Sequence, residues 1–499
     1  MPDSHPQPQP PSQPSDRAGA ASAGLLLCGA RLSDGRIVDV RLGGGLIEAV
    51  GTAGSLTAHG ARVDLSGHLL LPAPAEPHAH SDTALTAEVV DTGDRVGAVD
   101  SPAAVSPSCS PSYAPEDVRR RATEAALLQL GHGATALRSH VRIGDAQGLG
   151  RLEALLQARR SLRGLVEVTA VAVPRLLTGV AGADGLAMLR DAVKMGAGVV
   201  GGCPDLDPDP AGYVEAVLEV AAEHGCPVDL HTDGADPARL ARLAAMAGGL
   251  RPGVTLGPCA GLSLLPAEVA GRAADQLAAA GVTVVCLPQG ACGGVGQGWV
   301  ECGGTRRAGT PYGSVGPGGT PYGNAGSSGT PYENAGWGGT PYGSIGTGGT
   351  PYGGIGAGGA DPRGVAPVRL LRAAGVRVAA GSGALRDVAN PVGRGDPLEA
   401  AYLLASRGGL AAEDAYDSVS TVARAAMGLP EVRVEAGFPA ELLAVRGDGI
   451  AGVLSLAYSR IVVHRGRVVA RTSAVREYCD SEAAVALELP RQGGPDARP

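Results

Sequence analysis

The sequence predicts an α/β protein in which a (β/α)8 barrel of the TIM type is joined to a small β-sandwich-like domain built from both ends of the chain. The first observation is that eight short apolar segments alternate with helical segments between residues 71 and 430. Apolar strands that alternate with helices form parallel sheets, and eight such units close into a barrel. The second observation is that β-type runs lie on both sides of this region, at residues 24–70 and 431–475.

The barrel elements follow from apolar periodicity and from helix start and stop signals. The expected strands lie near residues 69–82, 134–143, 164–173, 198–202, 227–233, 253–257, 282–288 and 376–383. The expected helices lie near residues 115–130, 149–161, 183–195, 212–224, 237–246, 266–280 and 365–374. In the first helix, the negative charges of Glu116 and Asp117 in the first turn interact favourably with the positive end of the helix dipole, and Gly131 is expected to end the helix.

The two β-rich ends have the texture of hairpins. Residues 25–32, 36–45 and 46–54 are β-type runs separated by Asp-Gly and glycine clusters, which predicts a small antiparallel sheet. Near the C-terminus, Ser459–Ala470 has the pattern of a hairpin around Arg465 and Gly466. We therefore expect the two ends to form one composite domain.

Three stretches are expected to lie outside the folded core. Residues 1–23 are rich in Pro, Gln and Ser, which predicts a disordered tail, and a second tail is expected at 476–499. Residues 290–359 form a low-complexity insertion in which Thr-Pro-Tyr recurs every ten residues. The insertion is either a lid beside the active-site face or a neutral repeat expansion in a tolerant loop, and the similarity of its copies favours the expansion.

The composition excludes several classes of protein. A net charge of −8, with one Phe and two Trp, disfavours nucleic-acid binding, which needs a basic face and stacking aromatics. Nine scattered cysteines without CxxC pairs predict reduced thiols in a cytoplasmic protein. The N-terminus lacks the pattern of a secretory signal, and no uninterrupted apolar run of about 18 residues predicts a membrane span. The oligomeric state is left open.

The stretch Leu69–Asp82, LLLPAPAEPHAHSD, carries the main functional signal. His78 and His80 are two residues apart at the end of a buried strand, so both side chains point to the same side. His231 ends the fifth expected strand and faces the same barrel mouth, because active sites of such barrels lie at the carboxyl ends of the strands. Three neutral imidazoles there suit one divalent metal ion, Zn²⁺ or Fe²⁺, with a further position open.

These segments together resemble the amidohydrolase superfamily, and most closely its cytosine-deaminase-like branch. The resemblance covers roughly residues 24–469 apart from the insertion, and it rests on GHLLLPAPAEPHAHSD, ATALRSHVRIGD, VDLHTD and GSGALRDVANPVGRGDPLEAAYLLA in this order. It implies a metal site at His78, His80 and His231. It also implies hydrolysis of a carbon–nitrogen bond, other than a peptide bond, in a small pyrimidine-like or cyclic amidine molecule.

The resemblance also shows what this chain lacks. The family's strand-eight aspartate, a metal ligand and proton carrier, falls on Gly383. The family's proton-shuttling glutamate falls on Gly234, and its strand-six histidine falls on Pro258. The family's substrate-binding glutamine falls on Arg175, which would suit an anionic or carbonyl-rich ligand. Whether the chain is an enzyme is therefore left open by its residues.

A few polar residues remain as candidates for the missing roles. Asp233, two residues after His231, is the candidate for proton transfer, and Arg175 and His140 are candidates for binding substrate. For Asp233 and Asp82 a role as hydrogen-bond partners of the metal histidines is favoured, and for Cys259 a role as a buried thiol, whereas His140 fits equally well as a core histidine. Two functions stay open: a hydrolase with reduced or lost activity, and a catalytically inactive pseudoenzyme that serves as a ligand-binding or interaction module.

Overall fold

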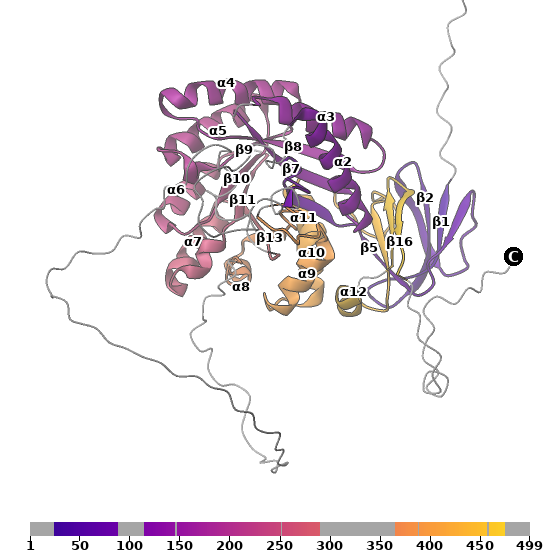
Figure 1. Cartoon of the computed structure of the whole chain (residues 1–499). Helices are drawn as coiled ribbons and strands as arrows, with labels where there is room; N and C mark the ends of the chain where they lie inside the picture. The colour runs from indigo at the N-terminus through magenta and orange to yellow at the C-terminus, as the bar shows by residue number, and fades with distance from the viewer. Residues whose placement is uncertain are drawn as a thin grey trace, which may run out of the picture. The chain divides into compact units, whose positions relative to one another are not determined.

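The structure is a computed structural model that describes residues 24–87, 114–144, 147–250, 252–289, 365–387, 389–456 and 459–474. These residues form two sheets of eight strands each (Figure 1). The predictions for the tails at 1–23 and 476–499 and for the insertion at 290–359 fall on residues outside this description. Within the described residues, no helix combines the length and the apolar character needed to cross a membrane.

One sheet is a parallel barrel whose strands follow each other in chain order. Its strands are β6 (Ala75–Ala79), β7 (Ala136–Ile143), β8 (Glu167–Pro174), β9 (Val199–Gly202), β10 (Val228–Thr232), β11 (Val254–Pro258), β12 (Thr283–Cys286) and β13 (Arg377–Ala380). A parallel bridge between Ala79 and Gly383 brings the segment after β13 alongside β6. The predicted eight-stranded β/α barrel is thus confirmed.

Helices connect these strands or follow the last of them (Figure 1). They are α2 (Pro115–Gly131), α3 (Gly150–Ser161), α4 (Gly179–Met195), α5 (Pro210–His224), α6 (Pro237–Ala247), α7 (Ala267–Ala279), α8 (Val368–Ala373), α9 (Pro397–Ser406), α10 (Ala412–Val419) and α11 (Thr421–Ala426). The carboxylates of Asp209, Asp236 and Asp396 accept backbone N–H groups at the starts of α5, α6 and α9. In each case a proline follows, which suits the first helical position.

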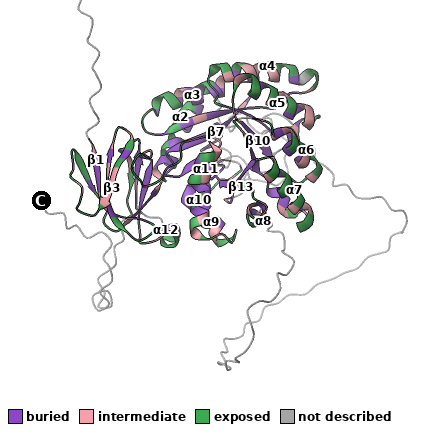
Figure 2. Ribbon diagram, turned by 180° about the vertical axis from the view of Figure 1, so that it is seen from behind, coloured by how far each residue is buried: buried purple, intermediate pink, exposed green. Residues whose placement is uncertain are grey.

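The main core lies between the barrel strands and these helices. Leu230 and Leu256 from the strands are fully buried in one cluster with Val217 from α5 and Leu277 from α7. Fully burying such a side chain stabilises the fold by roughly 1.5–3 kcal/mol. Figure 2 shows buried strands beneath helices such as α3, whose outward residues are exposed. This packing gives the barrel mouth a rigid frame.

The other sheet joins both ends of the described chain. Its strands are β1 (Leu25–Arg31), β2 (Ile37–Gly43), β3 (Leu46–Thr52), β4 (Ala61–Asp64), β5 (His68–Pro72), β14 (Leu442–Arg446), β15 (Arg460–His464) and β16 (Arg467–Thr472), with α12 (Ile450–Leu456) after β14. The antiparallel pairing of β5 with β14 unites the two ends, and a separate apolar core fills this domain. Because β5 leads directly into β6, this domain anchors the strand that carries His78.

The small antiparallel sheet expected for the first three runs is confirmed, because β2 pairs antiparallel with both β1 and β3, but the strands that follow pair differently. β4 and β5 both pair with β1 in parallel, one after the other along the same edge of β1. The reason is the path of the chain after β3, which returns to the start of β1, where Ala61 pairs with Leu25. A pattern of short β-type runs contains no information about such a return, so the sheet is mixed.

Candidate metal centre

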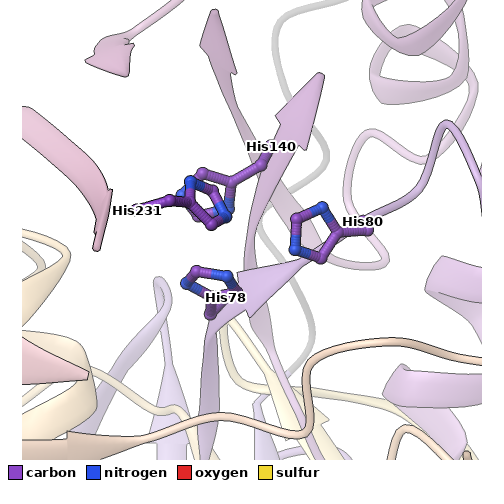
Figure 3. A group of neighbouring side chains, drawn as sticks. All are labelled: His78, His80, His140 and His231. Atoms are coloured by element: carbon purple, nitrogen blue, oxygen red, sulfur yellow. The ribbon is translucent and has the colours of Figure 1, made fainter. Parts of the chain in front are cut away.

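Four histidines converge at the barrel mouth (Figure 3). His78 lies in β6, His80 directly after it, His140 in β7 and His231 in β10. One ring nitrogen from each lies within 4.8 Å of the others. The shortest distance between ring centroids is 4.2 Å, from His78 to His140, and the longest is 5.5 Å, from His80 to His140. The structure therefore brings the three expected metal residues together and places His140 among them.

An irregularity in strand pairing sets the aim of the first two histidines. Glu76 pairs with Leu137 and Ala79 with Ser139, so β6 advances three residues where β7 advances two. An extra residue of this kind bends a strand and re-aims its side chains, and such bulges are common beside active sites. The bulge includes His78, which is fully buried, whereas His80 beyond it is half-buried.

Glu76 locks this strand to the segment after β13. Its buried carboxylate accepts the backbone N–H of His78 at 2.9 Å and that of Ser382 at 2.8 Å, and it also accepts the Ser382 hydroxyl. Burial raises the pKa of Glu76 to about 7, although these hydrogen bonds act in the opposite direction. The role of Glu76 was missed from the sequence, where the only signal is a carboxylate inside an otherwise apolar strand.

A buried ion pair crosses the barrel interior beneath the histidines. The guanidinium of Arg138 in β7 donates to Asp229 Oδ2 in β10 at 2.9 Å and to the carbonyl of Ala426 at 2.8 Å. The other oxygen of Asp229, Oδ1, lies 3.3 Å from Nε2 of His140. Burial favours the neutral acid, but His140 and Arg138 outweigh it and hold the pKa of Asp229 well below its usual range. Asp229 is therefore an anion held between a guanidinium and an imidazole.

The rings of His78, His80 and His231 are suited to binding metal because they are held neutral. Burial, with neighbouring imidazoles, lowers the pKa of His78 and of His231 well below the usual value, and burial with His140 lowers the pKa of His80 to about 3. The ring nitrogens of His140 and His231 are buried without a well-oriented hydrogen bond in the described part of the chain. Buried polar atoms without partners are costly, and a metal ion would satisfy them. The donor set fits one divalent ion such as Zn²⁺ or Fe²⁺.

The carboxylates considered from the sequence lie elsewhere. Asp82 is buried between Arg142, at 3.0 Å, and Arg151, at 3.6 Å. Burial raises the pKa of Asp82, but the two arginines outweigh it and hold that pKa below its usual range. Asp233 Oδ1 accepts the backbone N–H of Gly261 at 3.1 Å. Among the described residues, neither aspartate belongs to the histidine group, and nor does the buried thiol of Cys259.

Two of the three positions where the resemblance implies catalytic residues are shaped for glycine. Gly383 and Gly234 have φ of 71° and 73°, in the left-handed region that L-residues with side chains rarely adopt. A Cβ at Gly383 would lie 3.2 Å from a methyl carbon of Leu287. The third position, Pro258, is buried at the end of β11. Arg175 follows β8 at the same end of the barrel, and its side chain is exposed.

Comparisons with known proteins agree with this architecture. No family model matches the sequence. A pterin deaminase from Rhizobium rhizogenes is 28% identical over 257 residues, which are 50% of this chain and 58% of that protein. The chain thus matches little more than half the length of this curated relative.

Solved structures extend the comparison to nearly the whole fold. N-isopropylammelide isopropylaminohydrolase from Burkholderia multivorans has a TM-score of 0.66 at 22% identity, covering 91% of this chain and 99% of that one. The 5-methylcytosine deaminase from Klebsiella pneumoniae, liganded with 5-fluorocytosine, has a TM-score of 0.65 at 21% identity, covering 92% and 100%. At such identities the likeness shows the fold.

Fold and site together define a β/α-barrel protein with four histidines at its mouth that could hold a metal ion, and with a composite sheet made from both ends of the chain. Its similarity to the pterin deaminase and to these solved structures agrees with the resemblance to the amidohydrolase superfamily that the motifs indicated.

Proposed function

We propose that the chain is a metal-dependent hydrolase that cleaves a carbon–nitrogen bond, other than a peptide bond, in a small heterocyclic molecule. The observation that carries this proposal is the convergence of His78, His80 and His231, all held neutral, at the mouth of the barrel. One divalent metal ion held there would activate water and polarise the reacting carbon. The deaminases and the amino-hydrolase among the similar proteins support this reaction class.

The substrate class that we propose is a planar ring that carries an exocyclic nitrogen. The support comes from the pterin deaminase and the 5-methylcytosine deaminase to which the chain is similar. Within the cytosine-deaminase-like branch, we propose that Arg175 and His140 contribute to binding the ring. Arg175, after β8, would favour a ring with carbonyl groups or a negative charge, because a guanidinium donates to such oxygens in a planar fork.

We infer further that turnover is slow. Positioned acid and base groups contribute about 10²–10⁴-fold each, and glycine at positions 234 and 383 supplies neither. Asp233 is the carboxylate that we propose for the remaining proton transfer, because it lies two residues after His231. To reach a substrate it would have to release the amide of Gly261, which it accepts at 3.1 Å. This requirement supports a low rate.

A second candidate function is a pseudoenzyme that binds a ligand or partner without turning it over. One observation favours it: within the described residues, the group able to hold a metal consists of histidines alone, with no carboxylate to handle a proton. A cytoplasmic location is part of either proposal. The five described cysteines, which are Cys28, Cys203, Cys226, Cys259 and Cys286, are all free thiols and support it.

Ammonia release distinguishes the two candidates. Purified full-length protein, loaded with Zn²⁺ or Fe²⁺, is incubated with pterin, cytosine, 5-methylcytosine and related cyclic amidines. The hydrolase proposal expects release that disappears in His78→Ala and persists in His59→Ala, because His59 is exposed and lies outside the cluster. Metal-loaded protein that releases no ammonia from any of these compounds would leave the pseudoenzyme as the better account.

A further inference from the structure

We propose that His140 is the fourth protein ligand of the metal, so that this chain holds the ion with four histidine nitrogens. The resemblance to the superfamily implies an aspartate at that position in the coordination, and the corresponding residue here is Gly383. The inference rests on the metal site of the proposed function but not on turnover. It gives a new role to a residue that sequence reasoning had assigned to the substrate or to the core.

The ring of His140 has a central place in the histidine cluster. Its ring centroid lies 4.2 Å from that of His78 and 4.5 Å from that of His231. The ring of His80, which belongs to the expected metal set, lies farther from both, at 5.1 and 5.3 Å. Any ion placed between His78, His80 and His231 would therefore also face His140.

The separations also suit a tetrahedral ion, which can expand to five-coordinate when it takes up water. Zinc–nitrogen bonds of about 2.0–2.1 Å place the ligand atoms of a tetrahedron about 3.4 Å apart. The four donor atoms already lie within 4.8 Å of one another, so small side-chain rotations bring them to that spacing. Three donors and a remote fourth would have required a larger rearrangement.

The hydrogen bonding of His140 also favours a bond to metal. A neutral imidazole has one N–H and one lone pair, and both need partners when buried. Nε2 of His140 lies 3.3 Å from Asp229 Oδ1, which can take the N–H. The other ring nitrogen is buried among imidazoles without a hydrogen-bond partner in the described residues. A metal ion would meet this lone pair.

The carboxylate of Asp229 can hold the ring of His140 in position. Metal-binding histidines commonly donate their second nitrogen to a carboxylate, which fixes the ring and makes it a better ligand. Asp229 can do this because Arg138 clamps its other oxygen at 2.9 Å, and Thr255 Oγ1 lies 3.2 Å from the same guanidinium nitrogen. Acting through His140, the negative charge of Asp229 also replaces that of the carboxylate that Gly383 cannot provide.

Gly383 is poorly suited to carry a carboxylate. Its φ of 71° disfavours any side chain, and a Cβ there would lie 3.2 Å from a methyl carbon of Leu287. A donor for the fourth position is therefore better supplied by another strand. Among the described residues, His140 in β7 is the residue outside the expected three that has its donor atom in the cluster.

Cobalt binding to the full-length, metal-stripped protein tests the proposal, because Co²⁺ reports its ligands through visible absorption. We expect His140→Ala to change the absorption bands and to weaken Co²⁺ binding by more than tenfold. Asp229→Asn should weaken it by about 10–100-fold, the usual effect of losing such a supporting carboxylate. The exposed His59→Ala serves as control and should leave bands and affinity unchanged. Unchanged bands and affinity in His140→Ala would overturn the assignment.

A second measurement needs no variant and so does not depend on folding. A crystal structure of the zinc-loaded protein, phased at the zinc edge, should show a nitrogen of His140 about 2.0–2.1 Å from the metal. Zinc bound by the other three histidines with His140 beyond bonding distance, or no zinc bound at all, would overturn the proposal. Four bound histidines without ammonia release would contradict only the hydrolase, whereas turnover with three would contradict only this inference.

Discussion

Asp229 Oδ1 lies 3.3 Å from Nε2 of His140, although the two residues come from β10 and β7, three strands apart in the barrel. Arg138 binds the opposite oxygen of the same carboxylate. These buried residues inside the barrel thus hold the histidines at its mouth in position. The same buried ion pair therefore affects both the stability of the fold and the geometry of the site.

Replacing Asp229 with asparagine should destabilise the protein strongly. Removing one partner of a buried ion pair leaves the other charge uncompensated, which costs about 3–5 kcal/mol. Urea unfolding of the metal-free protein measures the loss. Glu431→Gln is the matched control, since its pair with Arg433 is exposed to solvent and contributes little to stability. An equal loss of unfolding free energy in the two variants would show that the buried pair stabilises the fold no more than the exposed pair does.

Replacing Gly383 with aspartate should not restore a complete site. The left-handed backbone costs a residue with a side chain roughly 1–2 kcal/mol, and the approach to Leu287 adds to this. Gly383→Ala, which also adds a Cβ at this left-handed position but no carboxylate, is the control. We expect both variants to lose similar stability in urea unfolding and neither to gain ammonia release. A Gly383→Asp protein that is as stable as wild type and more active would refute this view of the position.

Glu76→Gln should loosen the strand that carries the histidines. The glutamine side chain would point an amide N–H₂ at one of the donors that Glu76 now accepts, from His78 and Ser382. An unsatisfied buried donor costs about 1–3 kcal/mol, so thermal unfolding should occur at lower temperature. The exposed Glu48→Gln controls for the chemistry of the substitution. If Glu76→Gln unfolds like wild type, the carboxylate does not hold β6 to residue 382.

His68 should make the protein less stable in mild acid. Burial at the start of β5 lowers its pKa below the usual 6.5. As pH falls through about 6.5, the unfolded chain takes up a proton before the folded one, so stability is lost on acidification and is fully present above that pH. Unfolding curves between pH 7.5 and 5 should be less pH-dependent in His68→Gln than in wild type. A steeper dependence in the variant would reverse the sign of the argument.

The sequence predicted the barrel because apolar strands and amphipathic helices alternate so regularly, and it predicted His78, His80 and His231 because strand spacing fixes which side chains share a face. It left the place of His140 open between the site and the core, since a histidine inside an apolar strand looks the same whether it faces a site or the core. That difference depends on how β7 is paired with β6, including the bulge before Ala79.

Other features depend on contacts between residues far apart in the chain. Glu76 meets Ser382, 306 residues later, and no local pattern predicts that meeting. The parallel pairing of β4 with β1 likewise depends on the path of a loop. The helices α9, α10 and α11 follow the last barrel strand, beyond the alternation of strand and helix that predicted the others.

Metal content is the most direct test of the central claim, which is that His78, His80, His140 and His231 form one metal site. Protein reconstituted with Zn²⁺ and freed of excess ion is analysed for metal by mass spectrometry. We expect about one zinc per chain in wild type and in His59→Ala, and less than a tenth of that in the double variant His78→Ala/His231→Ala. Zinc that stays bound in the folded double variant, or that never binds to the wild type, would contradict it.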